Sequence, residues 1–111
     1  MNTIEMIDKE LLTLAAKAAG IEGVWDNESK CFVPADGPII WEPLSHDGAA
    51  LRLAVKLALV IWDWKQYQKA MAEARHGPAS GEYWEDVGND PYAATRRAIV
   101  RAAAAIGEQM K

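Results

Sequence analysis

The sequence has few basic residues, a single cysteine and no long apolar run, and each shortage excludes a class of protein. Lys and Arg number 12 against 16 Asp and Glu, which leaves a formal net charge of −4. An acidic chain lacks the excess of positive charge on which general binding to nucleic acids or anionic membranes depends. Cys31 alone excludes a disulfide within the chain. No apolar run approaches the roughly 20 residues of a membrane span.

What is present is an ordinary globular composition. The 111 residues are 50% hydrophobic and 25% charged, which fits one folded domain over 1–111 and argues against disorder. Glu5, Asp8 and Glu10 occupy the stretch in which a signal peptide needs basic and then apolar residues. We therefore expect a cytoplasmic protein.

The first and last parts of the chain have the apolar periodicity of helices. Over 3–19, apolar residues recur at three- and four-residue steps, with Thr3 expected as N-cap and Gly20 as the left-handed residue after the end. Asp90 and Pro91 form an N-cap and first-turn pair that opens the last helix. The predicted buried stripe of this last helix consists of Tyr92, Ile99, Ala103, Ile106 and Met110.

A third helix is predicted from Gly48 to about Leu59, capped by Ser45 or Asp47. Apolar residues cover most of its circumference, so we expect it to be buried on nearly all sides. Continued to His76 it would be about 43 Å long at ~1.5 Å per residue. A domain of this size has a radius of gyration of roughly 13 Å, so we expect a break near Leu59.

Two regions have the pattern of short strands. Residues 24–25 and 31–33 flank a turn-forming run and predict a hairpin, and 39–41 fit a third strand or an apolar plug. Residues 60–65 alternate, which places Trp62 and Trp64 on one strand face. The two rings are expected in the core beneath the helices, although such a pair can also stack on bases or sugars.

The next segments are less regular. Residues 69–75 favour a strand over a short helix, and 76–89 are predicted to be loop because of their glycines and proline.

Four strings resemble the phage ABA sandwich domain family. They are LAAKAAGI at 14–21, WEPL at 41–44, DGAALRLAVKL at 47–57 and DPYAATRRAIVRAAA at 90–104. The resemblance implies an α+β layered sandwich of three main helices on a small, mostly antiparallel sheet, with 60–75 rich in strand. It also implies a phage or prophage origin. It brings no catalytic residues, because none is established for the family.

No spacing in the sequence fits a catalytic, cofactor or metal site. His46 and Asp47 are adjacent at a helix start and face different directions, so a cap beside a surface histidine is expected. Cys31 has no activating neighbour and is expected to be a small buried apolar residue.

Two clusters are candidates for binding. The predicted loop carries Glu82, Trp84, Glu85 and Asp86, which can dock a basic partner or form a solvated loop with one anchoring Trp. The last helix carries a basic spot of Arg96, Arg97 and Arg101. Either it binds phosphate, or Arg96 spans the helix edge to a carboxylate or carbonyl while the other two are solvated.

The leading hypothesis is therefore a non-enzymatic, phage- or prophage-encoded accessory protein that binds a host or phage protein in the host cytoplasm. Nucleic-acid binding through Arg96, Arg97 and Arg101 is the alternative, although the acidic charge opposes it. No membrane association is expected, and self-association through the alanine-rich last helix is left open.

Overall fold

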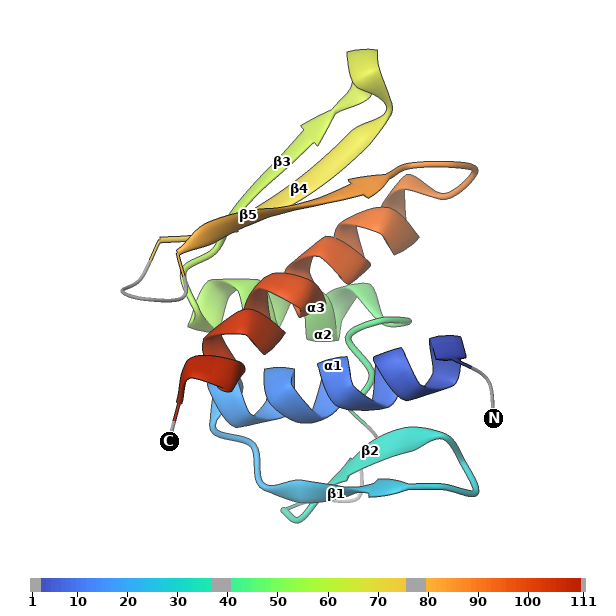
Figure 1. The fold of residues 1–111 in the computed structure, drawn as a ribbon, viewed down its shortest axis with the longest axis vertical. Coiled ribbons are helices and arrows are strands. Elements are labelled where there is room, and N and C mark those ends of the chain that lie inside the picture. Colours follow the sequence, from blue (N-terminus) through green and yellow to red (C-terminus); the bar gives the residue numbers. More distant parts are fainter. Residues whose placement is uncertain (1–2, 37–40, 76–79, 111) are drawn as a thin grey trace.

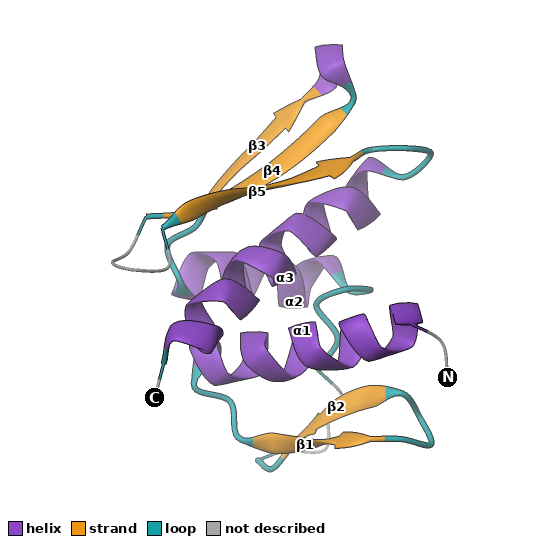
Figure 2. Ribbon diagram, in the orientation of Figure 1, coloured by secondary structure: helices purple, strands orange, loops and turns teal. Residues whose placement is uncertain are grey.

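Three helices separate two antiparallel sheets (Figure 1). The computed structural model describes residues 3–36, 41–75 and 80–110. The helices are α1 (Thr3–Ala19), α2 (Asp47–Lys56) and α3 (Pro91–Gln109). Figure 2 shows α1 and α3 as the central layers, with one sheet beyond α1 and the other beyond α3.

The two sheets differ in size. The smaller one, beyond α1, is a hairpin of β1 (Gly23–Asp26) and β2 (Cys31–Pro34). The larger one, beyond α3, has the strand order β3-β4-β5. Its strands are β3 (Val60–Trp64), β4 (Lys69–Ala74) and β5 (Gly81–Asp86), and the 3-10 helix η1 (Lys65–Tyr67) connects the first two.

Small side chains let α1 and α3 pack closely. Ala15 and Ala19 of α1 are buried in one core cluster with several alanines of α3. At the C-terminal end of α3 the backbones come closer still, because a Cβ added to Gly107 would lie 2.0 Å from the carbonyl oxygen of Leu14. Only glycine fits at this position.

The larger sheet covers α3 with its inner face. Ala70, Ala72 and Ala74 of β4 point inward and are buried against the helices. Side chains alternate along a strand, so the residues between these alanines point to the other side of the sheet. The sheet therefore has one face on the core and one face turned away from it (Figure 1).

The hairpin is fixed by its turn and by an aromatic contact. The hydroxyl of Ser29 and the backbone N–H of Glu28 donate to the carboxylate of Asp26 (2.7 and 3.1 Å), which holds the pKa of Asp26 below its ordinary value. Phe32 is buried and meets Trp41 edge to face, with ring centroids 5.9 Å apart.

The α+β fold class and most predicted elements are confirmed. The first helix ends as expected, with Gly20 at φ 74° and the N–H of Ile21 donating to the Ala16 carbonyl (2.9 Å). Asp90 caps α3 by accepting from the N–H groups of Tyr92 and Ala93. The hairpin, β3 and β4 lie where the sequence places them. The expected sheet is divided into two, one on each side of the helices.

The prediction for the helix over 48–59 is partly wrong. The break before β3 is confirmed, because α2 ends at Lys56. Leu51 and Val55 are exposed, so α2 lies at the surface with one face buried rather than nearly all of them. Its N-cap is His46, without a side-chain cap bond, rather than Ser45 or Asp47.

Three further predictions need correction. Thr3 is the first residue of α1 rather than its N-cap. Tyr92 and Met110 are exposed instead of belonging to the buried stripe of α3. Within the predicted loop over 76–89, residues 81–86 form strand β5, whereas 76–79 lie outside the described residues. Of the predicted strand or plug over 39–41, only Trp41 is described, and it forms a single bridge with Phe32.

The α1–α3 contact gives a test of the fold. We expect Gly107→Ala to lower the free energy of unfolding by about 2–3 kcal/mol, because the added methyl group overlaps the Leu14 carbonyl and forces the helices apart. Chemical denaturation measures this difference. Gly48→Ala in α2 is the matched control, since its Cβ would meet only the flexible Arg52 side chain. An equal effect of the two substitutions would contradict the close contact.

Candidate functional site

Four aromatic rings form a continuous cluster on the face of the larger sheet that points away from the helices. They are Trp62 and Trp64 of β3, Tyr67 of η1 and Trp84 of β5, and we call them the aromatic face. Trp62 and Trp64 stack with centroids 6.0 Å apart. Trp64 also meets Tyr67 edge to face at 4.6 Å and Trp84 at 6.1 Å. Trp64 is thus the centre of the cluster.

Strand register brings these rings together from distant parts of the sequence. Trp62 pairs with Met71 of β4, and Met71 pairs with Trp84 of β5, so the three side chains form one row across the outer face. Met71 is only 2% exposed because the rings flank it. Trp62, Trp64 and Trp84 remain 57%, 41% and 37% exposed. The expectation that Trp62 and Trp64 lie beneath the helices is therefore wrong.

Carboxylates border the aromatic face. Glu82 accepts a hydrogen bond from the indole Nε1–H of Trp84 (3.2 Å) and stands directly across from Glu73. Glu73 pairs with Arg75 (3.0 Å), and at the other end of the strands Lys69 pairs with Asp86. Of these carboxylates, Glu82 is the one without an ion-pair partner among the described residues.

The four candidate residues of the predicted loop belong to β5 and point to both sides of the sheet. Glu82, Trp84 and Asp86 lie on the outer face with the aromatic rings. Glu85 points inward to the guanidinium of Arg101 on α3, which also donates to the Trp84 carbonyl (2.8 Å). Glu85 therefore joins the sheet to the helix instead of contributing to a binding surface.

The three candidate arginines are engaged in separate contacts. Arg96 donates to the Leu44 carbonyl (2.8 Å) and to Asp47 (2.6 Å), so the expected contact across the helix edge is confirmed. Arg97 pairs with Asp8 of α1 (3.0 Å), and Arg101 pairs with Glu85 as described above. Arg97 and Arg101 each belong to a partly buried ion pair, so the expectation that both are solvated is wrong. The basic spot is largely neutralised.

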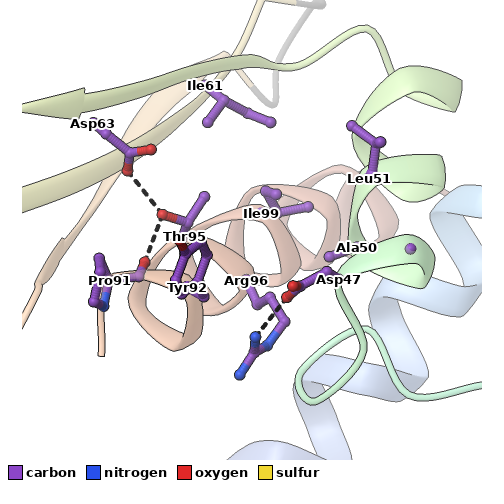
Figure 3. Close-up of a pocket in the computed structure, with 11 residues that line it drawn as sticks. Asp47, Ala50, Leu51, Ile61, Asp63, Pro91, Tyr92, Thr95, Arg96 and Ile99 are labelled. Atoms are coloured by element: carbon purple, nitrogen blue, oxygen red, sulfur yellow. Dashed lines mark hydrogen bonds and ion pairs between the residues drawn. The ribbon is translucent and has the colours of Figure 1, made fainter. Parts of the chain in front are cut away.

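An apolar cleft opens under β3, between α2 and the first turns of α3 (Figure 3). Its volume is about 490 Å³, and its walls include Leu51, Ile61, Tyr92 and Ile99. Two polar pairs lie at its margin. The Thr95 hydroxyl donates to Asp63 (2.8 Å), and Arg96 donates to Asp47. No sequence pattern predicts this cleft, because its walls come from three separate segments.

The described residues include no group of three or more His, Cys, Asp or Glu side chains placed to hold a metal ion. Cys31 is buried, as expected, with its Sγ 2.9 Å from the Ser29 hydroxyl. None of the described helices combines the length and hydropathy that crossing a membrane requires.

Comparison of the chain with protein-family models, with curated proteins and with solved structures finds no match in any of the three. The aromatic face and the cleft are therefore interpreted from their own geometry.

The opposite orientations of Glu82 and Glu85 give a test of the strand register. We expect Glu85→Gln to lower the free energy of unfolding by about 1 kcal/mol, because it removes one charge from a partly buried ion pair. Glu82→Gln on the outer face should change it by less than about 0.5 kcal/mol. Thermal or chemical unfolding distinguishes the two variants. The reverse order would place β5 in the wrong register.

Proposed function

We propose that this protein is a non-enzymatic protein-binding module and that the aromatic face is its contact surface. The observation that carries this proposal is the exposure of Trp62, Tyr67 and Trp84 around Trp64 on a sheet face that no described element covers. Large aromatic side chains supply most of the binding energy at protein interfaces. Clustered exposed apolar area of this kind marks interaction surfaces.

The aromatic face combines rings held in fixed positions with hydrogen-bonding groups at its rim. Stacking and edge-to-face contacts hold the rings of Trp62, Trp64 and Tyr67 in place, so little side-chain freedom is lost when a partner covers them. Indole N–H groups and the bordering carboxylates offer hydrogen bonds at the rim. This apolar centre with a polar rim has the anatomy of a protein interface.

Charge favours a protein partner over a nucleic acid. Stacking on exposed rings also serves single-stranded nucleic acids, but those sites combine the rings with a positive groove. Here the bordering cations Lys69 and Arg75 are each paired with a carboxylate, and Glu82 has no ion-pair partner among the described residues. Binding through Arg96, Arg97 and Arg101 would have to break their pairs with carboxylates before phosphates could replace them.

The biological setting is part of the proposal. The resemblance to the phage ABA sandwich domain family supports a phage- or prophage-encoded accessory protein that acts on a host or phage protein in the host cytoplasm. The acidic net charge of −4 opposes membrane binding, since anionic surfaces attract basic segments. No cofactor is needed for such a role.

Removing the ring of Trp62 tests the proposed function. We expect wild-type protein, immobilised and incubated with host lysate, to retain a stoichiometric protein that Trp62→Ala binds at least tenfold more weakly, because tryptophans are enriched among the hot spots of protein interfaces. The purified partner's affinity for each variant is the measurement. Trp62 is the most exposed of the three tryptophans, so its loss should leave the fold intact.

Val24→Ala is the control, because it removes an exposed apolar side chain from the hairpin sheet. A partner that binds wild type and Trp62→Ala equally would contradict the assignment of the aromatic face. Absence of any stoichiometric partner would contradict the function itself.

A further inference from the structure

Strand β3 extends beyond the helix that supports its sheet. The inner faces of β4 and β5 rest on α3, where Ala70 and Ala72 are fully buried and Tyr83 packs against the core. On the inner face of β3, by contrast, Ile61 is 37% exposed and Asp63 is exposed. The edge of the sheet therefore overhangs, and the cleft lies beneath the overhang (Figure 3).

The free edge of β3 carries unpaired backbone groups. Among the described strands β3 pairs only with β4. In an antiparallel pair, alternate residues direct their N–H and C=O groups toward the partner strand, and the residues between direct theirs away from it. An exposed edge of this kind is a template for one more strand.

Side-chain sites lie on both sides of that edge. A strand added to β3 would direct alternate side chains inward, toward the cleft lined by Leu51, Ile61 and Tyr92. The side chains between them would point outward, beside Trp62 and Trp64. Backbone pairing would supply affinity, and these two sites would select the sequence.

Asp63 is the one charged residue within β3. Asp63 accepts from the Thr95 hydroxyl, but no cation within the described part of the chain forms an ion pair with it. The other carboxylate at the cleft, Asp47, is already paired with Arg96. Asp63 is thus the carboxylate available to a positively charged group at the mouth of the cleft.

We infer that β3 binds an extended, basic segment of a partner protein as a fourth strand, with an inward Lys or Arg at Asp63 and a neighbouring apolar side chain in the cleft. This inference rests on the proposed function and specifies its partner.

Charge also argues against a second copy of this chain at the same edge. Antiparallel pairing of two β3 strands would place both Asp63 carboxylates on the same side of the joined sheet. Each copy would bring a further net charge of −4. A basic segment complements the acidic chain, whereas self-pairing brings two acidic chains together.

Selection from a random peptide library tests the inference without a known partner. Full-length protein is immobilised and used to select from an mRNA-displayed library of random eight-residue peptides at low salt. We expect the selected peptides to carry apolar residues at every second position and to be enriched in Lys or Arg. The strongest peptide, synthesised with blocked ends, should shift the backbone amide resonances of Ile61 and Asp63 more than those of β5.

Asp63→Asn provides the decisive variant, because an amide oxygen can still accept from Thr95 while the negative charge is lost. We expect the selected peptide to bind Asp63→Asn about three- to tenfold more weakly than wild type, with the difference shrinking at high salt. Glu28→Gln in the exposed hairpin turn removes the same charge elsewhere and should change nothing. N-methylation of the peptide at its ladder positions should abolish binding.

Three results would overturn the inference. They are a selection without basic enrichment, equal affinity for wild type and Asp63→Asn, or concentration-dependent dimerisation that shifts the β3 amides without peptide. A cellular partner that depends on Trp62 but not on Asp63 would leave the proposed function standing and remove strand addition. Asp63-dependent peptide binding with no cellular partner would support strand addition at β3 and contradict the proposed function.

Discussion

The close contact between α1 and α3 is the constraint on which the other layers depend. Gly107 lets the α3 backbone approach the Leu14 carbonyl, and alanines such as Ala15 and Ala103 keep the remaining interface narrow. Small side chains add little apolar area each, so the two helices gain stability by burying long stretches of backbone and Cβ against one another. Because α1 occupies one side of α3, the larger sheet can cover only the other side. The hairpin in turn covers the far side of α1.

The exposure of the aromatic face follows from this layer order. A single helix beneath a three-stranded sheet supports β4 and β5, whereas β3 extends past it. No described element covers the outer side, so the row of Trp62, Met71 and Trp84 shields itself. The flanking rings cover Met71 and remain partly exposed themselves. The same geometry that stabilises the sheet therefore leaves large aromatic area in contact with solvent, and it places an open strand edge beside an apolar cleft.

Local sequence patterns predicted where most helices and strands lie, but not which of their faces are buried. Asp90 and Pro91 predicted the start of α3, and Gly20 predicted the end of α1, because capping depends on residues that are neighbours in sequence. The outward direction of Trp62 was not predictable, because period-two alternation places residues on a common face without saying which face meets the core. Strand β5 was missed because its glycine and acidic residues are typical of loops, and tertiary pairing with β4 overrode that preference. The cleft depends on three segments whose spacing only the fold sets.

The distribution of charge bears directly on the proposed function. Arg96, Arg97 and Arg101 each neutralise a carboxylate on a different element, so the positive charge of α3 holds the layers together and little of it reaches a partner. The excess of negative charge remains on exposed carboxylates, among them Glu82 at the aromatic face and Asp63 at the strand edge. Under the proposed function, a partner would have to satisfy apolar rings, open backbone groups and exposed carboxylates together. An extended segment that alternates apolar and basic residues meets all three requirements, whereas a polyanion meets only the first.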